Sequence, residues 1–559
     1  MISVLSTNIV SPLGYTTDEN YRAVRNGNSK LARYDSWRDI PEPFVASLFD
    51  ANQQAELRID GYTLFESVAI NSIREALSKC TIDVDSKHTL FILSTTKANV
   101  DDLDKVEYAS PGASARKIAN YFGFKSEPLV VCNACISGVD AQILALRLLS
   151  SGYYDKAVVC GVDVVTPFVV AGFLSFKSLS TSECRPFDID RTGLNLGEAA
   201  ATIILSNDSH AVGLSQWQLC SGAMSNDAYH VSAPSPKGDG SCRALEKVLA
   251  SVNANDLALL STHGTATMFN DQMESKAIER MSLTSLPISA LKGYYGHTLG
   301  AAGVLETIIT MRALDDGIIL GVRGFEEIGV SGNINISTNE RSTDRKSFLK
   351  MISGFGGCNG ALLYEKKATP SNDITEKVAL RTQHRVNINP QSVVVDGETI
   401  PYTETGKALL AAIYKDRIGD YPKFHKMDIL SKLSIIATEL LVKQDEDHSD
   451  GTAVILFNRS SSIVADRKHN ETIKDRENFY PSPSLFLYTL PNIALGEIAI
   501  KFNFTGETSL YILDCRNEEI MQQVITSAMS HANISRLVTG WIDCTDNDYF
   551  EADVQIITK

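Results

Sequence analysis

The sequence lacks the features that mark membrane proteins and nucleic-acid-binding proteins. No apolar run approaches the roughly 18 residues that a membrane-spanning helix needs. Basic residues are outnumbered by acidic ones, 52 to 67, so the formal net charge is −15. This excess argues against nucleic acid or an anionic membrane as the main partner. The N-terminal stretch MISVLSTNIVSPLG has neither a basic region nor a small-residue cleavage site. We therefore expect a cytoplasmic protein without a membrane span.

Disulfide and zinc frameworks are also missing. Ten cysteines in 559 residues are too few for a disulfide scaffold, and their positions in apolar strands suit a reducing compartment. One C-x-x-C pair occurs, Cys132 and Cys135, but no second pair at ligand spacing would complete a zinc site. We therefore expect no metal. A redox role for this pair stays open on the local pattern alone.

Length and patterning indicate a protein of more than one domain. A chain of 559 residues, 44% hydrophobic and 21% charged, can bury a large core. Strand-like and helical segments alternate over residues 1–208 and again over residues 209–366. Such alternation predicts mostly parallel sheets with helices on both faces. We expect these two halves to form a duplicated α/β protein.

Cys135 lies at the most informative point of the first half. The run Leu129–Cys132 predicts a buried strand, and Val139–Leu149 predicts a helix that is apolar on nearly every side. Cys135 therefore falls in the turn before a helix N-terminus, where free N–H groups and the helix dipole are expected to lower the thiol pKa from about 8.5. A lone cysteine is nevertheless more often a small buried hydrophobe than a nucleophile.

Four further segments place polar residues among glycines. Each alone could be a turn or a packed histidine. Their occurrence together, after the Cys135 turn, favours one catalytic centre. They are CRPFDIDRTG from Cys184, STHGTAT from Ser261, KGYYGHTLGAAG from Lys292 and GFGGCNG from Gly354.

With these motifs, residues 1–366 resemble the β-ketoacyl-acyl-carrier-protein synthases, the elongating Cys-His-His type of the thiolase superfamily. The family's nucleophile motif matches CNACISG around Cys135. Its two histidine motifs match the segments His263–Glu274 and Lys292–Gly303. The block Arg185–Glu198 and the GFGGCN segment are present as well.

The resemblance implies a thiolase-like fold, a duplicated αβαβα layered arrangement, and a set of catalytic roles. Cys135 would carry the acyl group as a thioester. His263 and His297 would stabilise the enolate that forms when a malonyl group on a carrier protein loses carbon dioxide. One of the two would act as the base, and the sequence leaves open which. Lys292 would orient the site and keep it electropositive.

Further roles follow from the same resemblance. The backbone N–H groups of the nucleophile and of Phe355 would form the oxyanion hole, and Phe355 would also gate the acyl pocket. Thr265 and Thr267 would hydrogen-bond the pantetheine arm. Asp271 and Glu274 would be structural and tie loops together near the site.

The implied activity is decarboxylative condensation, giving a 3-oxoacyl-acyl-carrier protein in fatty-acid or polyketide-type chain elongation. Acyl carrier protein would be the partner and would bring its own phosphopantetheine, so no other cofactor is expected. A homodimer, or a heterodimer with a related ketosynthase-like subunit, is expected as in the family. Two alternatives stay open: an assembly subunit of the chain-length-factor type, and a transacylase without condensation. Retention of Cys135 with both histidine motifs argues against the assembly subunit, and the histidine motifs argue against redox use.

The C-terminal third has no place in the family motifs. Residues 367–377 resemble a polar linker. The patterns predict helices over Lys407–Tyr414 and Ile429–Val442, a strand over Ala453–Phe457 and a charged loop over Asp466–Asn478.

Residues 378–559 resemble the first half. Ala453–Phe457 is similar to Leu90–Ser94, and Leu537–Asp543 is similar to Val158–Asp163. We expect a degenerate third thiolase-like half with a structural or partner-binding role, since its apolar face must be covered. Cys515 would stand opposite the nucleophile, but it lacks small neighbours and later histidine motifs, so a bystander thiol is expected.

Overall fold

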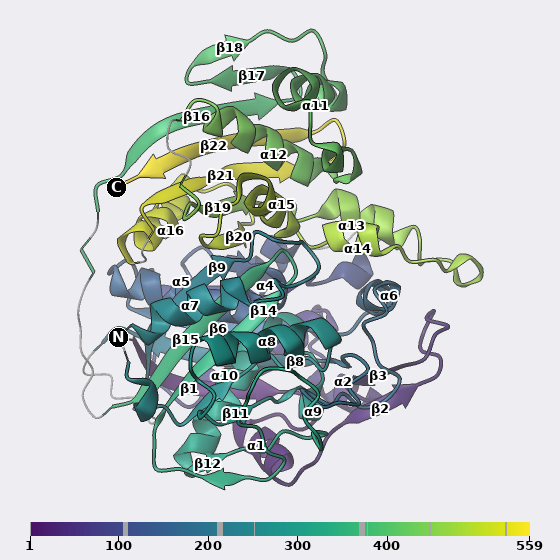
Figure 1. The fold of residues 1–559 in the computed structure, drawn as a ribbon, viewed down its shortest axis with the longest axis vertical. Coiled ribbons are helices and arrows are strands. Elements are labelled where there is room, and N and C mark those ends of the chain that lie inside the picture. Colours follow the sequence, from purple (N-terminus) through teal and green to yellow (C-terminus); the bar gives the residue numbers. More distant parts are fainter. Residues whose placement is uncertain are drawn as a thin grey trace.

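The computed structural model describes residues 2–103, 105, 110–208, 216–250, 252–367, 375–376, 378–445, 449–531 and 534–559. The last third of the chain is stacked on the first two thirds (Figure 1). Most of the predicted linker at residues 367–377 lies outside the described residues. Among the helices in the described ranges, none is long and apolar enough to cross a membrane.

The first half is built on a five-stranded sheet. Its strands lie in the order β5, β4, β6, β8 and β1, with β4, β5 and β6 parallel and β8 antiparallel to both neighbours. Leu90 and Ile92 of β4 face one core, and Phe91 and Leu93 face another. Because both faces are covered, the strands are apolar throughout rather than alternating. The strands are β1 (Ile2–Val10), β4 (Thr89–Ser94), β5 (Leu129–Val131), β6 (Lys156–Asp163) and β8 (Ala199–Ser206).

A second sheet forms the core of residues 216–366. Its strands lie in the order β11, β10, β14, β15 and β9, and the first residues of β9 also pair with β1. This pairing joins the two halves along one edge. The strands are β9 (Trp217–Asn226), β10 (Leu259–Ser261), β11 (Ile288–Ser289), β14 (Ser347–Gly354) and β15 (Cys358–Lys366).

Smaller elements and outer helices complete this part of the chain. Helices α3 and α4 pack on the first sheet, and α7 packs on the second. The helices are α1 (Thr17–Arg25), α2 (Ala51–Leu57), α3 (Leu64–Leu77), α4 (Pro111–Phe122), α6 (Pro167–Ser175), α7 (Asp239–Leu249), α8 (Met268–Arg280) and α9 (Lys292–Tyr295). The short strands are β2 (Leu31–Tyr34), β3 (Phe44–Ser47), β7 (Leu196–Gly197), β12 (Ile318–Ile319) and β13 (Arg341–Ser342).

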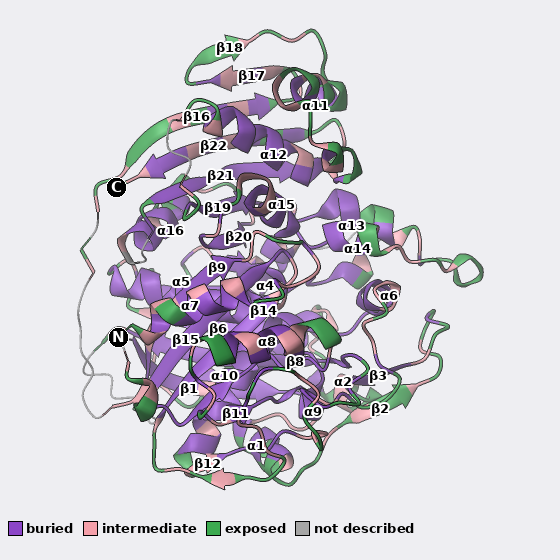
Figure 2. Ribbon diagram, viewed as in Figure 1, coloured by how far each residue is buried: buried purple, intermediate pink, exposed green. Residues whose placement is uncertain are grey.

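Two helices lie between the sheets. Every residue of α5 (Ser137–Ser150) is buried, and so is nearly every residue of α10 (Ala302–Asp315). This burial explains why the sequence shows no polar stripe in either segment. Gly303 lets the two backbones approach, because a Cβ there would lie 2.6 Å from the backbone nitrogen of Val139. Figure 2 shows the resulting buried centre. The helix–sheet–helix–sheet–helix layering predicted from the resemblance is confirmed.

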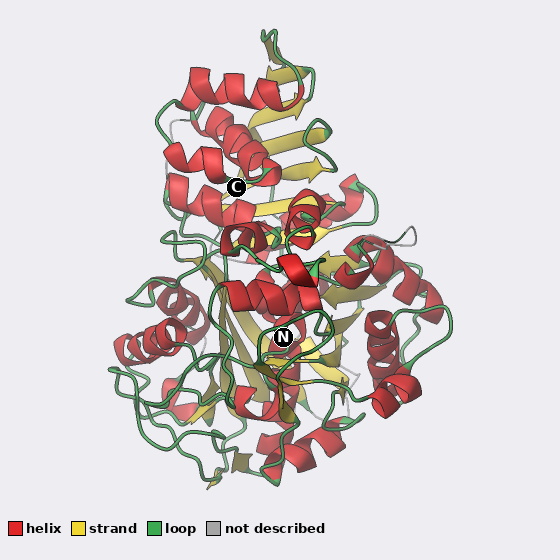
Figure 3. Cartoon of the chain, turned by 90° about the vertical axis from the view of Figure 1, so that its right-hand side faces the viewer, coloured by secondary structure: helices red, strands yellow, loops and turns green. Residues whose placement is uncertain are grey.

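The C-terminal unit, residues 378–559, repeats the strand order of the first half. Its strands lie in the order β20, β19, β21, β22 and β16, with β19, β20 and β21 parallel and β22 antiparallel to both neighbours. Figure 3 shows its helices gathered beside the strands. The strands are β16 (Arg381–Asn389), β17 (Ser392–Val395), β18 (Glu398–Ile400), β19 (Ala453–Asn458), β20 (Thr508–Ile512), β21 (Arg536–Cys544) and β22 (Phe550–Thr558).

The helices of the C-terminal unit show which local predictions hold. The helices expected over Lys407–Tyr414 and Ile429–Val442 and the strand at Ala453 are confirmed. The charged loop predicted over Asp466–Asn478 is wrong at its start, because Asp466 and His469 are buried in α13. The helices are α11 (Gly406–Ile413), α12 (Ile429–Val442), α13 (Ile463–Asn470), α14 (Pro483–Tyr488), α15 (Ile493–Phe502) and α16 (Glu518–His531).

The two parts of the molecule share one sheet. Strand β20 pairs antiparallel with β5, aligning Tyr511 with Val131 and Ile512 with Val130. The Cys132 N–H continues this ladder by donating to the Leu510 carbonyl at 3.2 Å. The edge of β5, which leads to the Cys135 turn, is therefore covered by the chain's own C-terminal unit.

Buried polar contacts secure this junction. Arg147 on α5 donates from both terminal nitrogens to the Glu507 carboxylate, each at 2.6 Å. The two side chains are only 3% and 2% exposed. Nearby, the Tyr511 hydroxyl donates to Asp140 at 3.0 Å, and the Asn133 side chain donates to the Thr508 carbonyl at 2.8 Å. Paired geometry of this kind is needed to offset the cost of burying two charges.

Replacing Glu507 with Gln should destabilise the protein strongly. The substitution leaves the Arg147 charge buried and uncompensated, a change that costs about 3 kcal/mol. We expect the urea midpoint of unfolding to fall accordingly. Glu518→Gln is the matched control, because its ion pair with Arg516 is exposed and should change the free energy of unfolding by under about 0.5 kcal/mol. Equal midpoints for the two variants would contradict the structural importance of the pair.

Candidate active site

Cys135 lies where β5 turns into α5. Ala134 adopts a left-handed conformation with φ of 48°, and a short 3₁₀ turn over Ala134–Ile136 leads into the helix. A non-glycine residue in this conformation costs roughly 1–2 kcal/mol, so the packing around it must hold the turn. The backbone N–H groups of Cys135 and Phe355 both point at the Cys135 sulfur. These are the two groups that the resemblance assigned to an oxyanion hole.

The thiol is protonated at rest. Burial raises the pKa of Cys135 to about 12, while the charge of Lys292 and the two backbone N–H groups lower it by less. The expectation that the helix N-terminus lowers the pKa of Cys135 is therefore wrong. Loss of water around the sulfur destabilises the thiolate more than the nearby dipoles stabilise it.

Two imidazole rings face this sulfur. The ring centroids of His263 and His297 are 5.0 Å apart, and the rings are nearly perpendicular. The Cys135 Sγ and one ring nitrogen of each histidine all lie within 4.8 Å of one another. Burial and the positive charge of Lys292 hold both histidine pKa values well below the usual range. Both rings are therefore neutral near pH 7.

Hydrogen bonds determine where each neutral ring carries its proton. The Leu299 N–H donates to Nδ1 of His297 at 3.1 Å, and Lys292 Nζ lies 3.0 Å from Nδ1 of His263. An amide or an ammonium can only donate, so each Nδ1 is an acceptor and each Nε2 carries the hydrogen. Among the described residues, Nε2 of His297 has no hydrogen-bond partner although it is buried. It is a donor available to a substrate oxygen.

Lys292 belongs to a buried network that the sequence analysis missed. Its Nζ donates to Glu306 at 2.6 Å and to the His263 carbonyl at 2.7 Å. Lys350 donates to the other oxygen of Glu306 at 2.5 Å. Burial raises the pKa of Glu306, but the two lysines outweigh it and lower the pKa. A lone lysine inside the apolar strand at Ser347–Gly354 was the available signal. The ammonium beside His263 disfavours a metal cation on the same ligands.

Asp271 and Glu274 hold the loop that carries His263. The two oxygens of Glu274 accept the N–H groups of His263 and Gly264, each at 2.7 Å. Asp271 accepts the Thr265 N–H at 3.0 Å and another backbone N–H from the first half. Both carboxylates are buried, and burial raises the pKa of Glu274 to about 7. They act on the loop backbone and not on the sulfur.

The two threonines lie at the end of the same loop. The hydroxyl oxygens of Thr265 and Thr267 are 2.9 Å apart, and α8 then begins with the exposed Met268 and Phe269. Between the threonines, Ala266 has φ of 61°, a left-handed conformation that glycine adopts at lower cost. The contacts around the loop must therefore hold this residue in place.

Asp163 is a further residue that the sequence analysis missed. Its carboxylate accepts the Gly300 N–H at 2.7 Å and the Thr96 N–H at 3.0 Å. Burial raises its pKa to about 6, and these hydrogen bonds lower the pKa by less. It joins the end of β6 to the loop after His297, and so aligns the two catalytic halves.

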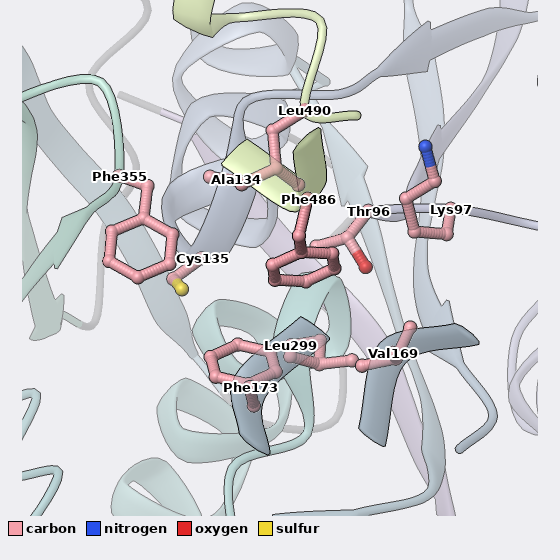
Figure 4. A pocket seen from close by; sticks show the side chains of 10 residues that line it. All are labelled: Thr96, Lys97, Ala134, Cys135, Val169, Phe173, Leu299, Phe355, Phe486 and Leu490. Atoms are coloured by element: carbon pink, nitrogen blue, oxygen red, sulfur yellow. The ribbon is translucent and has the colours of Figure 1, made fainter. Parts of the chain in front are cut away.

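A small apolar pocket adjoins the Cys135 sulfur (Figure 4). Its volume is about 10 Å³, hardly enough for one water molecule. Phe486 and Leu490 of the C-terminal unit form part of its wall. Nearby, the Asn492 side chain donates to the Phe355 carbonyl at 2.8 Å. The lining residues are Thr96, Lys97, Ala134, Cys135, Val169, Phe173, Leu299, Phe355, Phe486 and Leu490.

The pocket wall is fastened to the first half by another buried pair. Lys97 donates to Asp466 of α13 at 2.5 Å and to the Thr489 carbonyl at 2.6 Å. Gly172 of α6 is also required here, because a Cβ would lie 2.1 Å from the Phe486 ring. Residues almost 400 positions apart thus shape one pocket.

Two segments of the chain match family models of known proteins. Residues 80–211 match the model of the β-ketoacyl synthase N-terminal domain, and residues 218–326 match that of the C-terminal domain. Residues 80–326 are therefore similar to the two domains of β-ketoacyl synthases. The chain is 25% identical over 415 residues to 3-oxoacyl-[acyl-carrier-protein] synthase 2 of Rhizobium meliloti, covering 65% of this chain and 98% of that protein. It is 30% identical over 267 residues to nodulation protein E of the same species, covering 46% of this chain and 66% of that protein.

Solved structures extend the likeness in fold. "PfaC Keto synthase-Chain length factor" superposes with a TM-score of 0.75 at 14% identity, covering 100% of this chain and 78% of that chain. AntDE:AntF, a complex of a type II acyl-carrier protein with its ketosynthase, gives a TM-score of 0.59 at 19% identity. The match covers 66% of this chain and 99% of that chain. The whole of the chain, including the C-terminal unit, therefore has a counterpart in fold.

The raised pKa of Cys135 predicts an unusual pH dependence of alkylation. A group that ionises near pH 12 should react with iodoacetamide about tenfold faster for each pH unit between 7 and 10, without a plateau. Peptide mass spectrometry would follow Cys135, with the exposed Cys515 in the same samples as an internal comparison. A plateau near pH 8.5 or below at Cys135 would show that a thiolate is stabilised after all.

Proposed function

We propose that this protein is a β-ketoacyl synthase, which catalyses decarboxylative condensation of an acyl group held on Cys135 with malonyl-acyl-carrier protein. The product is a 3-oxoacyl-acyl-carrier protein in fatty-acid or polyketide-type chain elongation. One observation carries the proposal: a half-buried thiol, two buried neutral imidazoles and two backbone N–H groups converge in one site.

Loading is the first half-reaction. The Cys135 sulfur attacks the thioester carbonyl of an acyl-carrier protein, and the N–H groups of Cys135 and Phe355 stabilise the oxyanion. The bond to the pantetheine sulfur breaks as the new thioester forms. The proton of the Cys135 thiol ends on the departing pantetheine thiol, so loading takes up no net proton.

Condensation is the second half-reaction. The malonyl carboxylate leaves as carbon dioxide, and its electron pair passes to the enolate whose oxygen accepts hydrogen bonds from Nε2–H of His263 and His297. The enolate carbon attacks the acyl carbonyl on Cys135. The thioester bond to Cys135 breaks, and the sulfur takes up a proton from solvent, so condensation consumes one proton. Neutral imidazoles suit this step because they donate without requiring a buried positive charge.

Acyl carrier protein is the proposed partner. The relatives named 3-oxoacyl-[acyl-carrier-protein] synthase support this assignment, as does the carrier–ketosynthase complex among the structural neighbours. Its pantetheine arm would pass Thr265 and Thr267, and phosphopantetheine would arrive on the carrier as the only prosthetic group. We also propose a cytoplasmic location, in keeping with the composition.

The related subunit expected by resemblance is proposed to be part of the same chain. Strand β20 occupies the edge of β5, and the C-terminal unit has the strand order of a first half. Phe486, Leu490 and Asn492 then contribute to the site as a partner subunit would. This arrangement favours a monomer over the expected homodimer or heterodimer.

Separate assays of loading and condensation test the proposed activity. His297→Ala should still load an acyl group on Cys135 but condense about 10²–10³-fold more slowly, because one enolate donor is lost. Cys135→Ala should not load at all. Intact mass measures loading, and liquid chromatography with mass spectrometry measures 3-oxo product. His88→Ala, at an exposed position, is the control and should match the wild type.

The wild-type protein decides between the alternatives in the same assays. Loading without any 3-oxo product from malonyl-carrier protein would indicate a transacylase. Absence of loading across a series of acyl-carrier proteins would indicate an assembly subunit and would refute the condensation proposal.

The pocket beside Cys135 predicts a preference for short acyl groups that Phe486 enforces. Phe486→Ala should extend the accepted length, with kcat/KM rising about fourfold for each added methylene until the new space is filled. Loading rates for acyl-carrier proteins of two to twelve carbons would measure the profile. Phe502→Ala removes a ring from the same unit outside the pocket lining and should leave the profile unchanged. If Phe486→Ala left the dependence of loading rate on acyl chain length unchanged, Phe486 would not be the residue that limits the length of the acyl group.

A further inference from the structure

A second cavity lies in the C-terminal unit and shares no lining residue with the acyl pocket. Its volume is about 640 Å³, which is within the range of small-molecule sites. Its wall is formed by α11, the turns at Tyr414–Ile418 and Pro422–Lys426, the start of α12 and Lys468 of α13. The turn at Tyr414–Ile418 is π-helical, a rare geometry that is frequent at functional sites.

The floor of this cavity is apolar. Leu410, Tyr414, Phe424 and Met427 line it, and all four are buried. The rings of Tyr414 and Phe424 are stacked, with centroids 4.3 Å apart and planes 14° apart. Stacked, buried rings form a fixed surface against which an apolar chain can pack.

The rim of the cavity is basic. Lys407, Lys415, Lys432 and Lys468 line it, and within the described part of the chain none of them is ion-paired with a carboxylate. Burial lowers the pKa of Lys432, and the charge of Lys468 lowers it further, although Asp428 partly offsets both. Four lysines without ion pairs around one apolar cavity stand out in a chain of net charge −15. Their mutual repulsion would be relieved by a bound anion.

We propose that this cavity binds an anionic amphiphile, a molecule with an apolar chain and one carboxylate or phosphate head group. The apolar chain of the ligand packs against Tyr414 and Phe424 on the floor of the cavity. The head group of the ligand contacts the ammonium groups of Lys432 and Lys468. A purely apolar ligand leaves the lysines unpaired, and a small inorganic anion leaves the floor uncovered. Both parts of the ligand are therefore needed for binding.

Calorimetric titration of the full chain tests the ligand class. Decyl phosphate and decanoate, kept below their micelle concentrations, should each bind saturably, and their relative affinities distinguish a phosphate from a carboxylate head. Decanol and decyltrimethylammonium should bind at least tenfold more weakly. Octyl phosphate should bind about fifteenfold more weakly than decyl phosphate, because two buried methylenes are lost. Higher salt should weaken binding of the anions.

Matched variants test the location. Lys432→Gln with Lys468→Gln should lower the affinity for decyl phosphate at least tenfold. Lys426→Gln with Lys474→Gln removes the same charge from the same unit outside the cavity lining and should leave the affinity unchanged. The proposal would be overturned if decanol bound as tightly as decyl phosphate, or if the two double variants lost the same affinity for decyl phosphate. It would also be overturned if neither decyl phosphate nor decanoate bound saturably at millimolar concentration. The readout is binding, so this result is independent of whether the condensation proposal holds.

Discussion

The pairing of β5 with β20 is the contact on which the rest of the structure depends. β5 ends three residues before the turn of Cys135, and an uncovered strand there would leave its backbone N–H and C=O groups unpaired. The Arg147–Glu507 pair and the Asn133 hydrogen bond to β20 hold the two sides together. The strained backbone of Ala134 needs such support, because strain persists only where surrounding contacts determine it.

Burial governs the chemistry of the site more than any single charge does. It keeps the Cys135 thiol protonated and the two imidazoles neutral. Lys292 and Lys350 lie close to them and share the carboxylate of Glu306. A neutral, water-poor site with fixed donors is suited to forming an enolate, because the donors need no reorganisation when charge develops.

The C-terminal unit contributes residues to the site beside it and also has features of its own. Asn492 contacts the backbone of Phe355, and Phe486 closes the pocket next to the sulfur. Its own Cys515 is exposed, and no histidine motif follows it in the sequence. The unit thus contributes to the neighbouring site while keeping a separate cavity, lined by α11, α12 and α13, on its own helices.

Local sequence patterns were enough to predict the helices and strands and to name the reacting groups. The apolar run at Leu129–Cys132, the helix at Ile429–Val442 and the motifs around Cys135, His263 and His297 were readable because periodicity and motif spacing are local properties. The carboxylates near the site could be named but not placed. Their hydrogen bonds to backbone N–H groups appear only when the loops fold.

Only the tertiary structure decided how these pieces act on one another. The roles of Glu306, Lys350 and Asp163, the raised pKa of Cys135 and the wall formed by Phe486 depend on contacts between residues far apart in the chain. The physical reason is that strand pairing and removal from water are set by which surfaces meet. A sequence pattern shows which face of a helix or strand is apolar. It does not show which other helix or strand covers that face in the folded protein.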